Sequence, residues 1–206
     1  MSASRTAAPG LAAAPEPLVH RYDVEVLHLL VSPVHRYFGR PKDGPLTGED
    51  PQPQTAEVVA GKGLVGDRFF GKAAHLDAAV TLLAVEALEA VAAQLGTGPF
   101  DPLLARRNAV LRGAELEPLR GRVFALDGGS GPVLLAGRRQ ASPCAWMDRV
   151  LAPGAHAALR GRGGLRCEPL GSGRLHRGPA VLLSPVPLDP ARAGDAVLPR
   201  RGHPLP

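Results

Sequence analysis

Short apolar segments alternate with turn residues along most of the chain. The first segment, residues 24–32, is largely apolar and closes at Ser32-Pro33, a pattern typical of a buried strand. Similar strand-like segments recur farther along the chain, at residues 56–60, 78–83, 108–111, 122–126, 133–136, 165–169 and 180–184. Strands this short and this closely spaced favour an antiparallel sandwich or barrel over a regular alternation of strands and helices.

One segment has a clear helical pattern. Residues 85–95 carry apolar side chains at helical spacing, and Gly96 follows where helices commonly stop. Residues 145–151 and 155–160 each suit a short helix. Residues 39–53 are too rich in proline and glycine for any regular element, so we expect a long surface excursion there. The predicted fold class is therefore mainly β, with a few short helices.

The length of 206 residues suits one folded domain, and we expect a disordered tail at each of its ends. Residues 1–20 form an Ala/Pro-rich tail and residues 186–206 a Pro/Arg-rich tail, which leaves residues 21–185 for the β-barrel domain. The N-terminal segment lacks the apolar core of a signal peptide, and no run of about 18 apolar residues is present to span a membrane. We therefore expect a cytoplasmic protein without membrane contact.

The charge of the chain comes mainly from arginine. The net charge is +5, and the 24 basic residues include only three lysines, so 21 are arginines. A guanidinium suits phosphate and carboxylate groups, which favours an anionic partner, although a coding bias toward arginine explains the composition equally well. We do not expect nucleic acid as the partner, because the basic residues are scattered and aromatic residues are scarce.

The segment around Cys144 is the main candidate for chemistry. Cys144 and Cys167 are too few for a disulfide scaffold, so we expect both as reduced thiols. Pro143 restricts the backbone, and Cys144 falls at or just before the first turn of the helix expected at 145–151. The free amides there favour a thiolate, the form that a nucleophile, a persulfide carrier or a soft-metal ligand must present. The alternative is a small buried apolar side chain.

Three short motifs combine arginine with glycine or an amide in a way that suits an anion. They are Gly66-Asp67-Arg68 in a turn-rich segment, Arg106-Arg107-Asn108 at the start of a strand, and Arg162-Gly163 in a glycine-rich connection. Each has a structural alternative: an ordinary turn, a charged edge strand or a flexible link. The seven histidines show no metal-binding spacing, so we expect no zinc site.

Taken in this order, these segments resemble the MOSC family, the domain found at the C-terminus of molybdenum cofactor sulfurases and as small stand-alone bacterial proteins. The resemblance spans residues 24–183 and is carried by residues 63–68, 80–83, 86–88, 106–108, 112–116, 119–121, 143–144 and 162–164. The chain departs from the family pattern at Gly178-Pro179, where the family often has Gly-Asp before its last strand.

The resemblance implies a MOSC-type β-barrel and a role in transferring sulfur to molybdenum cofactor or in binding that cofactor. It implies that Cys144 is the catalytic residue, as a persulfide carrier, or a direct ligand of the molybdenum ion. The residues that would bind the anionic pterin, molybdopterin, are Gly66, Asp67, Arg68, Arg107, Asn108, Arg162 and Gly163. The implied protein partners are a cysteine desulfurase as sulfur donor and an acceptor molybdoenzyme.

Family descriptions also mention pyridoxal phosphate. Its chemistry belongs to the separate aminotransferase-like domain of the fused sulfurases, and 206 residues leave no room for that domain, so we do not expect this cofactor. Two other functions stay open. One is a component of a molybdenum-dependent reductase acting on N-hydroxylated compounds. The other is a non-catalytic module that delivers the cofactor, which would need the arginines and not the thiol.

Overall fold

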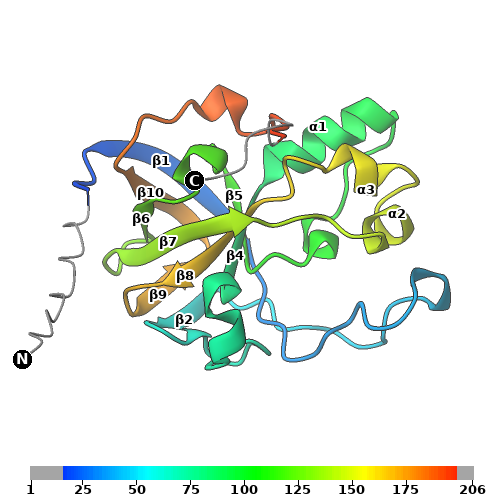
Figure 1. Ribbon diagram of the computed structural model, residues 1–206, viewed down its shortest axis with the longest axis horizontal. Coiled ribbons are helices and arrows are strands. Elements are labelled where there is room, and N and C mark those ends of the chain that lie inside the picture. The colour runs from blue at the N-terminus through cyan, green and yellow to red at the C-terminus, as the bar shows by residue number, and fades with distance from the viewer. Residues whose placement is uncertain (1–15, 199–206) are drawn as a thin grey trace, which may run out of the picture.

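The computed structural model describes residues 16–198, and its centre is a closed β-barrel (Figure 1). Seven strands close the barrel in the order β1-β10-β6-β7-β8-β4-β5, with β5 pairing back onto β1. Their bounds are β1 His20–Leu29, β4 Val80–Ala84, β5 Ala109–Arg112, β6 Val123–Asp127, β7 Val133–Gln140, β8 Leu165–Pro169 and β10 Gly178–Ser184. The predicted mainly β barrel is confirmed.

A second, three-stranded sheet has the order β3-β2-β9, with β2 at Thr55–Val59, β3 at Gly63–Leu64 and β9 at Gly173–His176. The strands β3 and β9 were not predicted. The pattern of β9 holds one fully buried side chain, Leu175, among polar neighbours, so it lacks the apolar alternation that marks a strand.

Most neighbouring strands are antiparallel, as predicted, but β4 and β5 are parallel. The helix α1 at Val85–Leu95 separates them in sequence and supplies the crossover that a parallel pair requires. This helix ends where the sequence predicts, with Gly96 in a left-handed conformation at φ 65°.

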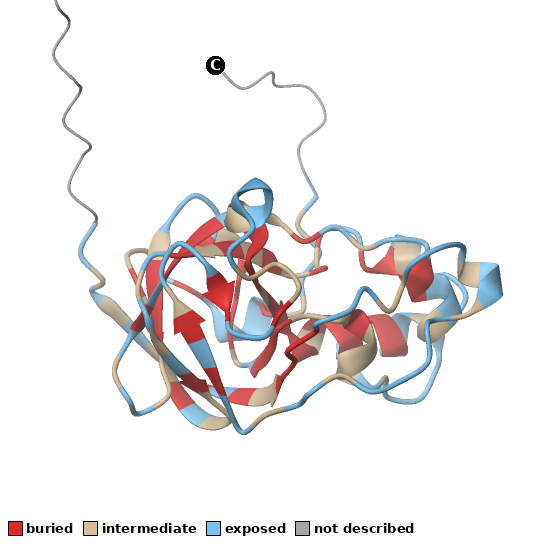
Figure 2. Cartoon of the chain, turned by 90° about the horizontal axis from the view of Figure 1, so that it is seen from below, coloured by how far each residue is buried: buried red, intermediate tan, exposed pale blue. Residues whose placement is uncertain are grey.

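Two short helices, α2 at Trp146–Val150 and α3 at Ala155–Ala158, lie with α1 beside the barrel (Figure 1). Elsewhere in the described range, residues 16–198, there are five short 3-10 helices: η1 Pro41–Asp43, η2 Ala73–Ala78, η3 Pro102–Ala105, η4 Glu117–Leu119 and η5 Pro190–Arg192. Figure 2 shows buried residues both along the barrel strands and on the helical side. One apolar cluster fills the barrel and the other joins the three α-helices.

Packing continues past residue 185, where we expected the domain to end. Leu188 and Ala193 are buried against the barrel, and the Val197 amide donates a hydrogen bond of 2.9 Å to the Gly161 carbonyl. The expected C-terminal tail therefore contains a packed segment at 186–198. Its buried side chains are too sparse among proline and arginine to form a readable pattern. At the other end, β1 already begins at His20, four residues before the predicted strand.

Of the tails expected at residues 1–20 and 186–206, the parts at residues 1–15 and 199–206 lie outside the described residues. Over residues 16–198, no helix combines the length and the apolar character needed to cross a membrane.

Candidate functional site

Cys144 lies on the connection between β7 and α2 and is exposed. Trp146 and Met147 anchor this connection, because both are buried in the helical cluster and the Trp146 ring stacks on Tyr37 at a centroid distance of 5.0 Å. The helix α2 has only five residues, so its dipole is weaker than the sequence analysis assumed.

The thiol opens onto a cavity of about 350 Å³. A second hollow of about 200 Å³ adjoins it, and both share one set of lining residues: His35, Arg68, Arg106, Arg107 and Arg166. Cys144, Tyr37 and Trp146 line the first part, and Asp67, Thr81 and Asn108 line the second. The cavity therefore has an aromatic wall and a thiol at one side and a strongly cationic centre.

Arg107 forms part of the cavity wall, and most of its donors are already engaged. Its Nε donates to the Gly163 carbonyl at 2.9 Å, and its Nη atoms donate to the carbonyls of Ala105 at 2.9 Å and Ala141 at 3.3 Å. Burial and the charge of Arg166 lower the pKa of Arg107 to about 10, an effect that the nearby Cys144 partly opposes. Arg107 therefore stays charged at neutral pH and joins β5 to the segments on both sides of Cys144.

Asn108 lies where the sequence predicts a ligand-binding amide, but the structure uses its amide internally. Its Oδ1 accepts hydrogen bonds from the Thr81 amide at 2.9 Å and the Thr81 hydroxyl at 2.8 Å. Its Nδ2 donates to the Leu30 carbonyl at 3.2 Å and to Asp67 Oδ2 at 3.1 Å. All four hydrogen-bonding positions are taken, so Asn108 positions the cavity wall and has no position left for a ligand.

Asp67 is also structural. Its buried carboxylate accepts from the Ser32 amide at 3.1 Å, the Phe69 amide at 3.0 Å and Asn108. Gly66 precedes it with φ 86°, in a turn that only glycine adopts readily. Both residues therefore shape the loop that presents Arg68.

Arg68 is the residue of that motif that faces the cavity. Its Nη1 donates to the Ser32 hydroxyl at 3.1 Å, and its guanidinium lies 4.4 Å from the centroid of the Phe69 ring. Its Nε is buried without a hydrogen-bond partner in the described part of the chain. Burial lowers the pKa of Arg68, and the charge of Arg106 adds to that effect while Asp67 opposes it. Arg68 therefore keeps donor capacity for an anion.

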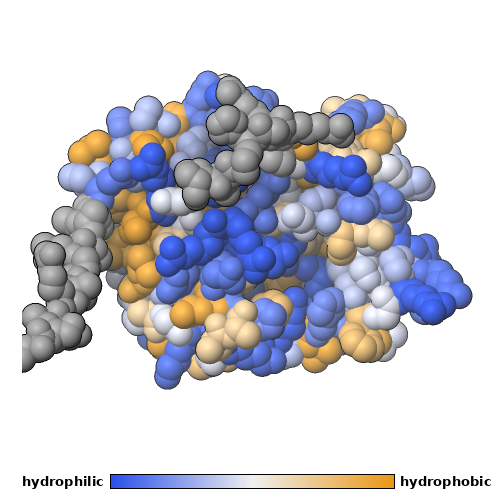
Figure 3. All heavy atoms as spheres, viewed as in Figure 1, coloured by the Kyte–Doolittle hydropathy of each residue, from blue (hydrophilic) through white to orange (hydrophobic). Residues whose placement is uncertain are grey.

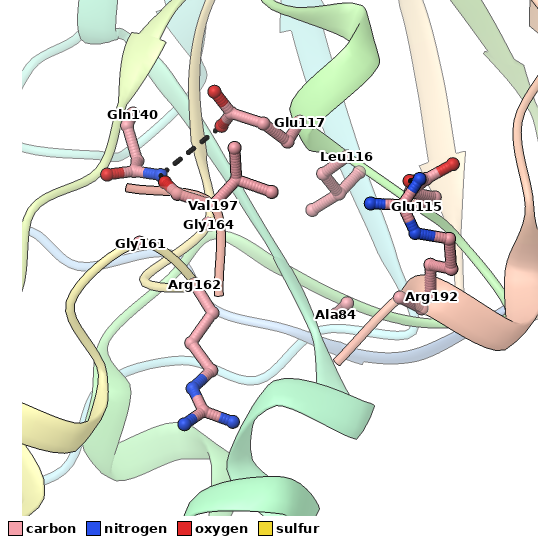
Figure 4. A pocket seen from close by; sticks show the side chains of 11 residues that line it. Ala84, Glu115, Leu116, Glu117, Gln140, Gly161, Arg162, Gly164, Arg192 and Val197 are labelled. Carbon is pink, nitrogen blue, oxygen red and sulfur yellow. Dashed lines mark hydrogen bonds and ion pairs between the residues drawn. The ribbon is translucent and has the colours of Figure 1, made fainter. Parts of the chain in front are cut away.

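Arg162 does not reach this cavity, contrary to the sequence prediction. Its Nη2 donates to Gln94 Oε1 at 2.6 Å and its Nε to the Ala158 carbonyl at 2.9 Å, so it holds α3 against α1. Figure 4 shows its side chain extending away from Gln140 and Glu117, in a separate hollow of only about 30 Å³. The motif gives the position of the arginine but not the direction of its side chain.

Gly163 contributes backbone only. Its carbonyl accepts from Arg107, and a Cβ atom on it would lie 2.2 Å from the Ala141 carbonyl oxygen. The glycine is therefore required by close packing of the two segments that flank Cys144.

Arg166 and His35 were not predicted as cavity residues, and Arg106 was predicted only as part of an anion-binding motif, not among the cofactor-binding residues. Arg166 occupies a half-buried position that alternates with the buried Leu165 and Cys167 of β8, and this alternation is the only signal that could have found it. Arg106 adopts φ 55° and donates to Asp50 at 2.7 Å and to the Ser32 hydroxyl. His35 lies in the irregular segment after β1, where no pattern fixes its direction.

The second cysteine is not part of the site. Cys167 is fully buried in the barrel, and burial strongly raises the pKa of its thiol. Among residues 16–198 there is no cluster of three His, Cys, Asp or Glu side chains that could hold a metal ion.

Comparison with known proteins shows the fold. No protein-family model and no curated protein sequence matches the chain. The YuaD protein of Bacillus subtilis matches with a TM-score of 0.62 at 16% identity, over 79% of this chain and 96% of that one. YiiM of Geobacillus stearothermophilus and YiiM of Escherichia coli each give a TM-score of 0.52, at 16% and 18% identity. These two matches cover 78% and 85% of this chain and 75% and 76% of theirs. These matches show that the chain shares its overall fold with YuaD and YiiM.

Proposed function

We propose that this chain is a MOSC-type sulfur carrier that binds molybdenum cofactor and holds transferable sulfur as a persulfide on Cys144. One observation carries the proposal: the exposed thiol of Cys144 opens onto the same cavity as the guanidiniums of Arg68 and Arg107. A sulfur carrier needs an accessible thiol, and a cofactor with a phosphate group needs cationic donors beside it.

The cavity suits the cofactor in size and chemistry. Ligand pockets typically have volumes of roughly 300 to 1,000 Å³, and the larger part of this cavity alone has about 350 Å³. The Cys144 thiolate is a soft ligand of the kind that binds soft metal centres, and the guanidiniums suit a phosphate. When bound, molybdenum cofactor would supply the metal centre at which sulfur is exchanged.

Three residues that line the cavity would each have a separate role in binding. Arg68 would hold the phosphate of the pterin, and Arg107 would keep the two segments beside Cys144 in place. Tyr37, whose hydroxyl donates to the Leu104 carbonyl at 2.7 Å, would present its ring as a wall of the cavity. Burial raises the pKa of Tyr37 to about 12, so this hydroxyl stays protonated.

The test compares three proteins: wild type, Cys144→Ser and Cys167→Ser. Each is incubated with a cysteine desulfurase and isotopically labelled cysteine, and the protein-bound sulfane sulfur is measured by cyanolysis. The proposal predicts loading of the wild type and of Cys167→Ser, and none of Cys144→Ser. Equal loading of all three would reject it.

A cofactor-delivery module is a second candidate, favoured by the four guanidiniums that line the cavity independently of the thiol. It predicts that Arg68→Gln lowers pterin binding and that Cys144→Ala does not. Loss of pterin binding in Cys144→Ala alone would reject the delivery function.

A further inference from the structure

Arg166 differs from the other arginines of the cavity in having no partner. It lies on β8, half-buried, and lines both parts of the cavity. Within residues 16–198 its guanidinium makes no hydrogen bond or ion pair, whereas Arg107 donates to three carbonyls and Arg106 to Asp50, Ser32 and Val34. The five donors of Arg166 are therefore available to a ligand.

The charge of the cavity is not balanced by the protein. Arg68, Arg106, Arg107 and Arg166 line it, and Asp67 is the one carboxylate lining it among the described residues. The charge of Asp67 acts on Arg68 and offsets one positive charge, and Asp50, paired with Arg106, offsets another. Asp77 acts on Arg166 from outside the cavity, but it is itself paired with Arg139. Two positive charges are therefore left over, and Arg107 and Arg166 repel each other across a partly desolvated space. A ligand with two negative charges would relieve this repulsion better than a monoanion.

The buried Nε of Arg68, which has no partner in the described chain, points to the same kind of ligand. Arg68 and Arg166 line the same cavity, and each offers a planar set of donors that matches the oxygens of a tetrahedral oxyanion. The Cys144 thiol opens onto the same cavity, and Cys144 lies near enough to Arg107 to oppose the lowering of the Arg107 pKa.

We infer that Cys144 also takes sulfur directly from a small dianion that carries sulfane sulfur on a sulfonate group, with thiosulfate as its simplest form, and that Arg166 selects this donor. Arg166 and Arg68 bind the sulfonate oxygens, and the outer sulfur faces Cys144. This inference rests on the proposed persulfide function and adds to it the class of donor and the residue that recognises it.

The step balances without a further reactant. The Cys144 thiolate attacks the outer sulfur of thiosulfate, and its electron pair forms the new S–S bond. The S–S bond of thiosulfate breaks, and its electron pair leaves with sulfite, a dianion that Arg166 and Arg68 also stabilise. The protein is left with a persulfide anion, which a nucleophilic acceptor such as cyanide then converts back to the thiolate.

The experiment measures sulfite release and thiocyanate formation by the reduced full-length protein, with sodium thiosulfate as donor and cyanide as acceptor. The wild type should turn over, and Arg166→Gln should lower kcat/KM for thiosulfate by about tenfold to a hundredfold, the loss expected for charged hydrogen bonds. Arg166→Lys should recover part of the activity, because it keeps the charge and loses the planar set of donors.

Two controls distinguish recognition of the sulfur donor by Arg166 from a general effect of the substitution on folding. Figure 3 shows a strongly hydrophilic surface over β7. Arg138→Gln removes an exposed arginine of this strand, which is paired with Glu168 and does not line the cavity. It should retain wild-type turnover. A small alkyl hydropersulfide, which has no sulfonate group, should load Cys144 equally well in the wild type and in Arg166→Gln.

Equal use of thiosulfate by the wild type and Arg166→Gln would overturn the role of Arg166. Loading by the hydropersulfide without any loading by thiosulfate would overturn the donor class while leaving the persulfide function intact. Failure of both donors to load Cys144 would overturn the inference together with the proposed function.

Discussion

Replacing Asn108 by alanine should destabilise the whole domain. The substitution removes a side chain that makes four hydrogen bonds, and it leaves the Leu30 carbonyl, the Thr81 amide and Asp67 Oδ2 each without one partner. A buried polar group that loses its partner costs about 1 to 3 kcal/mol. Because the cavity beside Asn108 admits water, the low end applies to each group, and the free energy of unfolding should fall by about 3 kcal/mol.

Thermal unfolding followed by circular dichroism measures this loss. For a domain of this size 1 kcal/mol corresponds to roughly 2 to 4 °C, so Asn108→Ala should lower Tm by about 6 to 12 °C. The control is Glu89→Gln, which breaks only the exposed ion pair with Arg112 and should change stability by less than about 1 kcal/mol. A Tm equal to that of the wild type, together with lost pterin binding, would refute the structural role and restore the ligand-binding role predicted from the sequence.

Three further predictions concern packing, pH and thiol reactivity. Gly163→Ala should lower the free energy of unfolding by several times the roughly 1 kcal/mol typical of a point mutation, because the new Cβ would lie 2.2 Å from the Ala141 carbonyl oxygen. An unchanged midpoint of urea unfolding would contradict this close packing. Burial and a neighbouring arginine lower the pKa of His28 below 6.5 in the folded protein, so its contribution to stability is complete above pH 6.5 and is lost as the pH falls from there through the lower pKa of the folded state. Urea titrations should show a smaller acid-induced loss of stability in His28→Gln than in the wild type, and identical losses would count against this pKa shift. A thiol reagent should modify Cys144 in the native protein and reach Cys167 only after unfolding, and rapid native reaction of both thiols would show that the barrel does not bury Cys167.

Most of the strands and α1 are predictable from the sequence because their signals are local. An apolar run bounded by turn residues is enough to place β2, β8 and β10 within about two residues. The parallel pairing of β4 and β5 is not visible in this way, because it depends on where the crossover through α1 returns the chain. The buried Leu188 and Ala193 are missed for a similar reason, since only the folded barrel supplies the surface that covers them.

The candidate site likewise has a part that local motifs predict and a part that depends on the folded structure. The motifs locate Cys144, Arg68 and Arg107, which the structure brings to one cavity. They do not give side-chain direction, so Arg162 is assigned to the cavity although it binds Gln94, and Arg166 is missed although it faces the cavity. A sequence motif fixes spacing along the chain, whereas the donors left free for a ligand depend on every hydrogen bond made by neighbouring segments.

The central claim is that Cys144 carries transferable sulfur beside a cationic cavity that binds molybdenum cofactor. The most direct measurement is tandem mass spectrometry of the Cys144 peptide, with metal analysis of the same sample, from protein purified from a molybdenum-replete host. We expect part of the Cys144 peptide to be heavier by one sulfur atom. We also expect the wild type to retain molybdenum and Cys144→Ser to lose it. An unmodified Cys144 peptide from protein that retains no molybdenum would contradict it.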